Sequence, residues 1–284
     1  MAVHLVDTLN LQILNVGHAT VGHDWNWTDV YSPFTRILCA TGGQAWIIVN
    51  NVRVSLRPGM LYLVPAYTRH SYICDDSFLH YYIIIYEGVR SGSLFDRYAL
   101  PVEIPSTAND EELFAELCRR HPQSQLTVFN PKSYDNQRSI ASSYQRFNGL
   151  GDADKMYIRG AVLLILSRFF AAGSPRLASI DKRIESVVNY IDEHLDSNMS
   201  LDTLAEVACI SKAYLIRLFT LGYGMTPIVY INRRRVEKAQ LMLFTTSMSV
   251  KEIAYALGFT DNSYFNRLFK KYTGLTPMNY RLSS

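Results

Sequence analysis

The C-terminal third of this 284-residue chain contains one helical unit twice, and this repeat constrains the fold more than any other feature. The two copies are offset by 49 residues at their start and by 50 later, so one extra residue lies in a turn. Such self-similarity indicates two copies of one supersecondary unit. The matching segments are 200–211 with 249–260, 214–219 with 264–269, and 223–230 with 273–280.

Each copy has the layout of a helix-turn-helix. A first helix is followed by a turn at a small residue, Cys209 or Gly258, and then by a polar residue that can cap the next helix, Ser211 or Thr260. The second helix of each copy separates a buried face from a free one by its apolar spacing. The predicted inward side chains are Tyr214, Leu215, Leu218 and Phe219 in the first copy and Tyr264, Phe265, Leu268 and Phe269 in the second.

The opposite face of each second helix has the chemistry to contact base edges. Arg suits the acceptors of guanine, Asn suits adenine, and small apolar groups touch the thymine methyl. On an isolated helix, a solvated surface explains such residues better. The duplication favours DNA, because one connecting helix over 227–244 presents both second helices to successive major grooves, roughly 34 Å apart. The free faces carry Ala213, Ile216, Arg217 and Thr220 in the first copy and Asn262, Ser263, Asn266, Arg267 and Lys270 in the second.

The charge distribution agrees with a polyanion partner for this part of the chain. The net charge is +3, but residues 1–179 hold 15 basic and 15 acidic side chains, whereas residues 211–284 hold 11 and 3. A local surplus of this kind attracts a polyanion, although a solvated surface also accommodates it. We predict phosphate contacts, which raise affinity without specifying sequence, for Ser211, Lys212, Thr220, Arg233, Arg234, Lys251, Thr260, Lys270, Lys271 and Arg281.

The N-terminal part is predicted to be an antiparallel β-domain, a barrel or a sandwich. Short strands are expected over 36–41, 45–49, 52–56, 61–64 and 80–86, followed by helices over 111–120 and 154–172. The second helix has a wide apolar stripe, typical of a dimer seam or of core packing. Residues 121–150 are expected to form a loop or a broken helix. The domains are then 1–172, a linker over 173–179 and an all-α domain over 180–284, which makes the chain an α+β multidomain protein.

Residues 181–284 resemble the DNA-binding domain of the AraC/XylS family of bacterial transcription regulators. The resemblance rests on the doubled unit, on the connecting segment 230–243, on the run 253–271 and on the closing Gly274-Leu-Thr-Pro-Met-Asn-Tyr-Arg. It implies a dimeric regulator of promoter DNA, most often an activator working with RNA polymerase. It also implies base contacts, although Ala213 and Ile216 lack the polar groups frequent there. The implied positions are Ala213, Ile216, Arg217, Asn262, Ser263, Asn266 and Arg267.

The β-domain resembles the cupin-like sensor domain of sugar-responsive members of the same family. The similar segments are Thr41-Gly-Gly-Gln-Ala, Leu56-Arg-Pro-Gly-Met-Leu-Tyr-Leu-Val-Pro-Ala and His70-Ser-Tyr. This implies a small effector, such as a sugar, held near Tyr72 and Tyr81, whereas Gly42 and Ile83 depart from the arabinose-responsive pattern. The residues themselves offer polar and aromatic groups that could orient a polyol, although strand alternation forbids all of them pointing inward. These groups are Arg36, Trp46, His70, Tyr72, His80 and Tyr82.

Other function classes fit less well. Cupin-type metal enzymes use a His-x-His pair with a following Glu, whereas His70 is followed by Ser71 and Tyr72, and the four cysteines are scattered. We therefore expect no enzyme, no metal and no cofactor. The longest apolar run, 161–166, is far shorter than the ~20 residues of a membrane span, and no signal peptide is apparent, so we expect a cytoplasmic protein. A regulator without an effector, whose β-domain only dimerises, stays open as an alternative.

Overall fold

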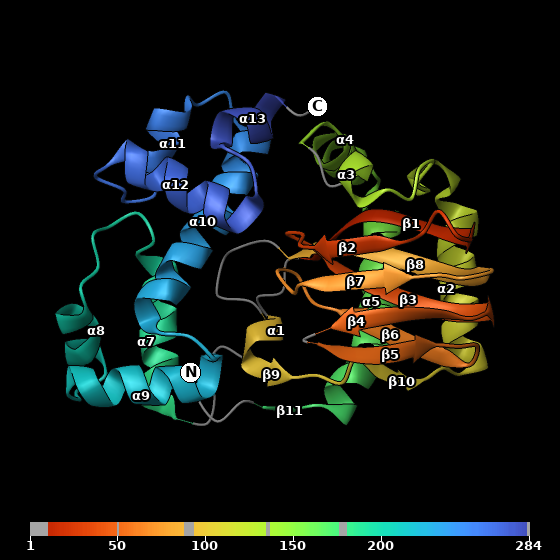
Figure 1. Ribbon diagram of the computed structural model, residues 1–284, viewed down its shortest axis with the longest axis horizontal. Coiled ribbons are helices and arrows are strands. Elements are labelled where there is room, and N and C mark those ends of the chain that lie inside the picture. The colour runs from red at the N-terminus through yellow and green to blue at the C-terminus, as the bar shows by residue number, and fades with distance from the viewer. Residues whose placement is uncertain (1–10, 50, 88–93, 135–136, 176–180, 283–284) are drawn as a thin grey trace. The chain divides into compact units, whose positions relative to one another are not determined.

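The computed structural model describes residues 11–49, 51–87, 94–134, 137–175 and 181–282. Residues 176–179 of the expected linker lie outside these ranges. The chain divides into two compact units (Figure 1). One, here called the β-unit, comprises the described residues within 11–87 and 100–172, and the other, called the helical unit, comprises the described residues 94–99, 173–175 and 181–282. Each unit is described by itself.

The β-unit confirms the predicted antiparallel domain, in the form of two hydrogen-bonded sheets. All five predicted strands are present, and the structure adds four more in these sheets. The five-stranded sheet has the order β1 (Leu11–Val21), β8 (Phe78–Glu87), β3 (Thr35–Gly43), β6 (Met60–Val64) and β10 (Glu103–Pro105). The four-stranded sheet has the order β2 (Trp27–Val30), β7 (His70–Ile73), β4 (Ala45–Val49) and β5 (Val52–Leu56).

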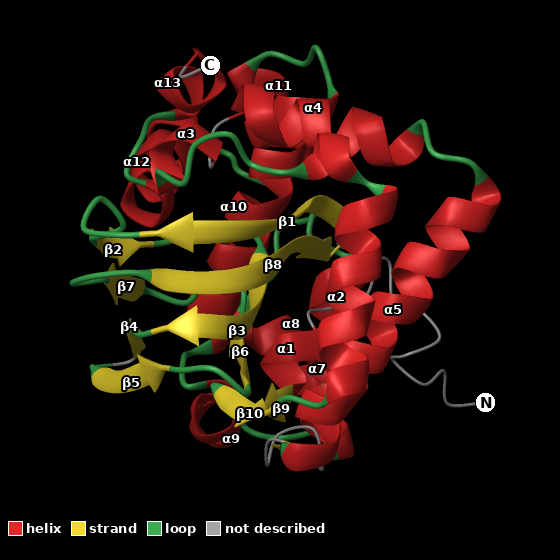
Figure 2. Cartoon of the chain, turned by 90° about the vertical axis from the view of Figure 1, so that its right-hand side faces the viewer, coloured by secondary structure: helices red, strands yellow, loops and turns green. Residues whose placement is uncertain are grey.

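Helices cover one face of the five-stranded sheet, and the four-stranded sheet lies on its other side (Figure 2). The helices on that face are α2 (Ala108–Arg120) and α5 (Asp152–Ala172), with the 3-10 turn η2 (Pro122–Ser124) after α2. Helix α4 (Gln137–Asn148) packs on β1, and the one-turn helix α3 (Pro131–Tyr134) precedes it. A capping box between Thr107 and Asp110 starts α2, and the buried Asp110 also pairs with Arg168 of α5. The sequence predicts a loop or a broken helix for the polar segment 121–150. Its described residues contain the short helical pieces η2, α3 and α4, which agrees with a broken helix.

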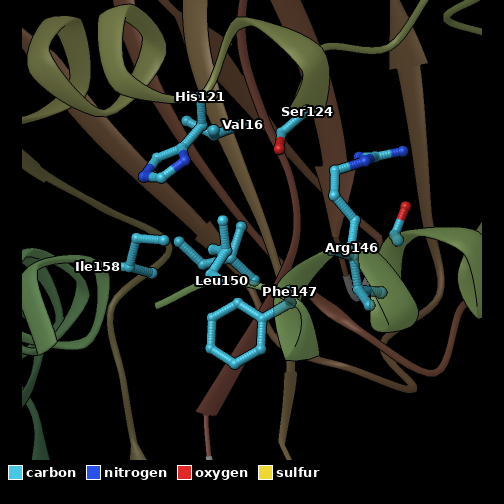
Figure 3. Close-up of a pocket in the computed structure, with 10 residues that line it drawn as sticks. Val16, His121, Ser124, Arg146, Phe147, Leu150 and Ile158 are labelled. Carbon is cyan, nitrogen blue, oxygen red and sulfur yellow. The ribbon is translucent and has the colours of Figure 1, made fainter. Parts of the chain in front are cut away.

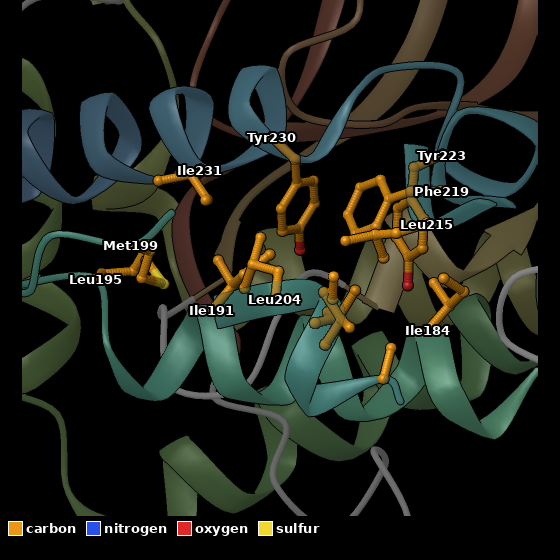
Figure 4. Packing of buried hydrophobic residues seen from close by; sticks show 14 residues of the cluster. Ile184, Ile191, Leu195, Met199, Leu204, Leu215, Phe219, Tyr223, Tyr230 and Ile231 are labelled. Carbon is orange, nitrogen blue, oxygen red and sulfur yellow. The ribbon is translucent and has the colours of Figure 1, made fainter. Parts of the chain in front are cut away.

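The helical unit confirms the all-α prediction for its C-terminal part. Its helices are α7 (Lys182–Glu193), α8 (Leu201–Val207), α9 (Lys212–Tyr223), α10 (Pro227–Thr245), α11 (Val250–Ala256), α12 (Asn262–Thr273) and α13 (Pro277–Leu282). Two apolar cores form, one for each repeat. The first gathers side chains from α7, α8 and α9 around Tyr230 of α10, as Figure 4 shows. The second gathers α11, α12 and α13 around Val236, Ala239 and Leu243 of the same helix.

A short segment that precedes β10 also belongs to the helical unit. It consists of α1 (Leu94–Arg97) and β9 (Tyr98–Ala99), and β9 pairs with β11 (Ser174–Pro175). The buried Arg97 donates to Asn189 Oδ1 at 2.9 Å and lies 3.4 Å from Glu185 Oε1, both on α7. These contacts fasten the segment to the first helix of the C-terminal part.

Within the described ranges, no single helix has both the length and the apolar composition of a membrane span. The helices α9 and α10 meet such a test only as a pair, and that pair is bent by 55°.

Candidate nucleic-acid interface

The first helix-turn-helix is formed by α8 and α9, as the sequence predicts. Ser200 caps α8 by accepting the amide of Thr203, and Ser211 caps α9 by accepting the amide of Tyr214. Between the helices, Cys209 adopts a φ of +53°, a left-handed conformation that lets the chain turn sharply. These local choices fix where α9 begins.

The second helix-turn-helix, α11 and α12, repeats the design with one difference. Ser249 and Glu252 form a reciprocal capping box at the start of α11, and Gly258 supplies the left-handed turn at a φ of +72°. The cap of α12 is Asp261, which accepts the amide of Ser263. The sequence predicts Thr260 as this cap. Thr260 lies one residue before the cap and is exposed, and Asp261 takes its place because its carboxylate accepts the Ser263 amide.

The predicted free faces of α9 and α12 are accessible. Seven of the nine side chains assigned to them are the predicted base contacts, and none of these seven is buried. The two arginines, Arg217 and Arg267, are both exposed and occupy equivalent positions of the repeat. The exposed members of the base set are Ala213, Arg217, Ser263 and Arg267, and the half-buried members are Ile216, Asn262 and Asn266.

Two tyrosines expected in the interior lie at the surface instead. Tyr214 is 40% exposed and Tyr264 is 42% exposed. Tyr214 lies beneath the Arg183 guanidinium, 5.5 Å away, and the Tyr264 hydroxyl accepts a hydrogen bond from Asn232 Nδ2 of α10 at 3.1 Å. Their hydroxyls favour positions that reach water or a polar partner, so the helical period alone places them wrongly.

Most of the predicted phosphate contacts are also accessible. Lys212 lies near the start of α9 and pairs with Asp202 of α8 at 2.8 Å, so a phosphate would compete with that carboxylate. Ser211 is exposed, although its hydroxyl also caps α9. The exposed candidates are Ser211, Lys212, Thr220, Lys251, Thr260, Lys270 and Lys271.

Three other predicted phosphate contacts already have partners within the helical unit. Arg234 is 3% exposed and pairs with Asp192 at 3.1 Å and with Glu237 at 2.6 Å. Arg233 pairs with Glu237 at 3.1 Å, and Arg281 donates to the carbonyl oxygen of Met248 at 2.6 Å. We withdraw Arg234, because its charge is buried and compensated. The basic run of α10 looks uniform in sequence, and burial alone separates its members.

In the β-unit, only some of the predicted effector residues line one cavity. Arg36, Tyr72 and Tyr82 line a small cavity between the two sheets, together with Trp25 and His80. The cavity volume is about 20 Å³, room for about one water molecule. Arg36 is buried, donates to Ser32 Oγ at 2.7 Å and lies 4.6 Å from the Phe34 ring centre. Strand β8 therefore directs His80, Tyr82 and Ile84 inward.

Two expected effector residues point away from this cavity. Tyr81 lies on the other face of β8, where its ring packs 4.6 Å from His18 and 6.2 Å from Phe114. Trp46 lies half-buried beneath the Arg53 guanidinium at 4.2 Å. Both follow from strand alternation, because Tyr81 precedes an inward Tyr82 and Trp46 precedes the buried Ile47.

A larger cavity involves residues that the sequence analysis did not select. Its volume is about 250 Å³, and its lining includes Asp24, Trp25, Trp27, Phe129 and Asn130. It shares Trp25 and Phe129 with the small cavity, so these two rings belong to both walls. The loop 22–26 carries no periodicity, which is why only a cluster of tryptophan and acidic residues could have signalled the site.

Burial keeps His70 and His80 neutral. It lowers the pKa of His80 to about 3, and burial together with the positive charge of Arg36 lowers the pKa of His70 to about 3. The Nδ1 of His70 donates to the carbonyl oxygen of Thr68 at 2.8 Å. Burial also raises the pKa of the Tyr82 phenol, whose oxygen accepts the amide of Leu126. The expected residue His70 thus lies beside Tyr72, not in the cavity lining.

A third hollow, shown in Figure 3, lies between β1, η2 and α4. His121, Ser124, Ser143 and Arg146 line it with apolar neighbours, and its volume of about 10 Å³ is below that of a bound organic molecule. Among the described residues, no three His, Cys, Asp or Glu side chains are placed to hold a metal ion.

The comparisons with known proteins concern mainly the helical unit. A family model described as a helix-turn-helix domain matches residues 204–283. The arabinose operon regulatory protein of Escherichia coli strain K12 is 34% identical over 119 residues, which are 42% of this chain and 41% of that relative. The regulatory protein SoxS of the same strain is 35% identical over 103 residues, 36% of this chain and 96% of SoxS. The match thus spans about two fifths of the arabinose regulator.

A whole-chain likeness exists at the level of the fold. The crystal structure of ToxT from Vibrio cholerae with a bound unsaturated fatty acid aligns with a TM-score of 0.53, covers 96% of this chain and 95% of ToxT, and is 17% identical. Together with the near-complete match to SoxS, the doubled helix-turn-helix defines the class. The chain belongs to the AraC/XylS family of helix-turn-helix transcription regulators.

Proposed function

We propose that this protein is a sequence-specific regulator of bacterial transcription that binds promoter DNA through α9 and α12. The observation that carries the proposal is the pair of accessible helix faces, each with an exposed arginine at the equivalent position, Arg217 and Arg267. Arginine donates two parallel hydrogen bonds to guanine in the major groove. The exposed lysines near both helices add affinity for phosphates. A cytoplasmic location, where bacterial DNA lies, is part of this proposal.

A selection from random-sequence DNA tests this proposal. The purified full chain is incubated with a pool of random duplexes, and bound duplexes are amplified and sequenced over several rounds. We expect enrichment of one bipartite sequence whose two halves lie about one helical turn apart. A pool that stays random through every round, or enrichment that persists when both arginines are replaced by alanine, overturns the proposal.

We further propose that a small polar effector, such as a sugar, binds in the β-unit. The larger cavity supports this proposal. Its volume is about 250 Å³, and its wall contains the rings of Trp25, Trp27 and Phe129 and the polar side chains of Asp24 and Asn130. Aromatic faces with a few polar groups are typical of small-ligand sites. The inner cavity is too small to admit a ligand until Trp25 or Phe129 moves. An effector that binds only one arrangement of these rings would increase the population of the conformation that has this arrangement.

Thermal unfolding in the presence of candidate ligands tests the effector. A ligand that binds the folded state raises the midpoint by mass action. We expect a panel of sugars and sugar acids to contain a stabilising member whose effect is lost on Trp27→Ala. If no member stabilises the protein while duplex selection succeeds, the β-unit serves dimerisation without an effector. A stoichiometric metal in the purified protein would instead favour a cupin-type enzyme.

We also propose that the regulator is a homodimer joined through α5 and that it activates by contacting RNA polymerase. The buried side of α5 packs in the β-unit through Ile158, Ile165 and Phe169. Its opposite side is also apolar, with Met156 76% exposed and Leu164 57% exposed. A helix that is apolar on both sides has a second surface to bury, which a second copy of α5 would cover. The activator role is inferred from the family.

A further inference from the structure

One buried arginine lies where the two helix-turn-helix motifs meet. Arg235, in the middle of α10, is 7% exposed. Its Nε donates to the carbonyl oxygen of Leu195 at 3.0 Å, and its Nη2 donates to the carbonyl oxygen of Ser197. Both carbonyls belong to the loop between α7 and α8, in the first repeat's half of the unit. Arg235 thus ties the connecting helix to the first motif.

The same guanidinium also contacts the second motif. It lies 5.2 Å from the ring centre of Phe259, the residue after the turn glycine Gly258. A Cβ at Gly258 would lie 2.8 Å from Arg235 Nη2 and 2.9 Å from the carbonyl oxygens of Asp196 and Ser197. The turn of the second motif therefore packs directly against the loop of the first, with Arg235 between them. We call this cluster, 195–197, 235 and 258–259, the junction.

The partners of Arg235 at the junction fix the orientation of its guanidinium. A guanidinium has donors in a fixed planar fork, so two carbonyl oxygens and one ring face define its orientation closely. Burial lowers the pKa of Arg235, and the nearby Tyr264 and Asp196 oppose that effect. A buried charge tolerates little displacement, because every movement away from its partners leaves it uncompensated. The two cores are otherwise separate clusters that share α10.

We infer that Arg235 is a positioning residue that fixes α12 relative to α9 and thereby makes the protein selective for the spacing between the two halves of its DNA site. This inference rests on the proposed function. Inserting one base pair moves one half-site by about 3.4 Å along the axis and rotates it around the duplex. A pair of helices held rigidly cannot follow that movement, whereas a pair joined only by α10 can bend and follow it.

The first experiment measures the separation in the free protein. Spin labels are placed on Leu221→Cys and Lys271→Cys, equivalent exposed positions of α9 and α12, in a Cys209→Gly background that removes the exposed native thiol. We expect a narrow distance distribution in the otherwise unchanged protein and in Lys238→Met, a control on the same helix. Arg235→Met should broaden the distribution at unchanged helix content, and Arg235→Lys should do so less. Equal widths in all four proteins overturn the inference.

The second experiment measures spacing selectivity on DNA. The selected duplex is compared with versions that carry one base pair more or fewer between its halves. We expect the unchanged protein and Lys238→Met to bind the altered spacings at least about tenfold more weakly, and Arg235→Met to lower that ratio to about two- to threefold. An unchanged ratio in Arg235→Met overturns the specificity role. If no duplex is ever selected, the proposed function fails, while the distance measurement still decides the junction.

Discussion

At the scale of single residues, the basic side chains of the helical unit divide into two groups that sequence alone does not separate. Arg217 and Arg267 lie exposed on α9 and α12, whereas Arg234 is buried against two carboxylates. The three side chains have the same chemistry and opposite surroundings. Their substitution should therefore affect different properties, binding in one case and folding in the other.

Arg267→Ala should weaken binding to the selected duplex by about 1–3 kcal/mol and relax one base position. The reason is the loss of hydrogen bonds to a base edge with no change in the core, because the side chain is exposed. Titration of the selected duplex and of its single-base variants measures both effects. An equal loss on random DNA would assign Arg267 to phosphates instead.

Arg234→Met should destabilise the helical unit by about 3–5 kcal/mol, because it removes the buried cation that pairs with both Asp192 and Glu237. Arg233 still pairs with Glu237, which places the expected value towards the lower end of that range. Denaturant unfolding of Arg234→Met and of Arg217→Met gives the comparison. A difference below about 0.5 kcal/mol would show that the ion pairs contribute nothing to folding.

The buried histidines His70 and His80 give a pH dependence with a definite sign. The pKa of His80 is about 3 in the folded state, against an ordinary value of about 6.5 when unfolded. The unfolded chain therefore takes up the proton first, so stability is complete above about pH 6.5 and falls as the pH drops towards 3. His70 behaves in the same way.

Near pH 5.5, each of these histidines should cost about 1.4 kcal/mol of stability relative to pH 7.5. Urea unfolding of the native protein at the two pH values, compared with His80→Gln, isolates one contribution. We expect the substituted protein to lose less stability on acidification. An identical loss in both proteins would mean that His80 is charged in the folded state.

At the scale of elements, sequence patterns predicted the helices of the repeat and the strands β3, β4, β5, β6 and β8, and they missed β1, β2, β7 and β10. The helices α8, α9, α11 and α12 follow the repeat, because caps and turn residues are local signals. Strand β1 was missed, because a helix layer and the second sheet bury both of its faces and remove the alternation. The cavity residues Trp25 and Phe129 lie on irregular segments, where periodicity carries no information.

The two turns of the repeat differ in what they tolerate. Gly258→Ala should destabilise the helical unit by about 2–4 kcal/mol, since it adds left-handed strain and a clash with the carbonyl oxygens of Asp196 and Ser197. Cys209→Ala should cost less than about 1 kcal/mol, because Cys209 already adopts a positive φ with a side chain. Thermal unfolding of both variants compares the same alanine at equivalent turns. Equal costs would contradict the packing at the junction.

The outer face of α5 should control the oligomeric state. Leu164→Glu places a charge at the centre of the proposed dimer surface, where its burial is unfavourable. We expect sedimentation to show a dimer for the native protein and for the surface control Gln145→Glu, and a monomer for Leu164→Glu. A dimer in all three would move the interface away from α5.

At the scale of the whole molecule, the structure describes two compact units, and residues 94–99, expected in the N-terminal domain, belong to the helical unit. The helical unit has two cores that share α10, so both candidate DNA-contacting helices belong to one folded body. The β-unit has its own core and the three hollows described above. The account depends on the claim that both helices of the helical unit engage one duplex together.

Hydroxyl-radical footprinting on the selected duplex tests that claim most directly. The native protein should protect two patches about one helical turn apart. Arg217→Ala should weaken protection of one patch and Arg267→Ala that of the other, because each arginine belongs to a different helix. A single protected patch, or loss of the same patch in both variants, would contradict the account.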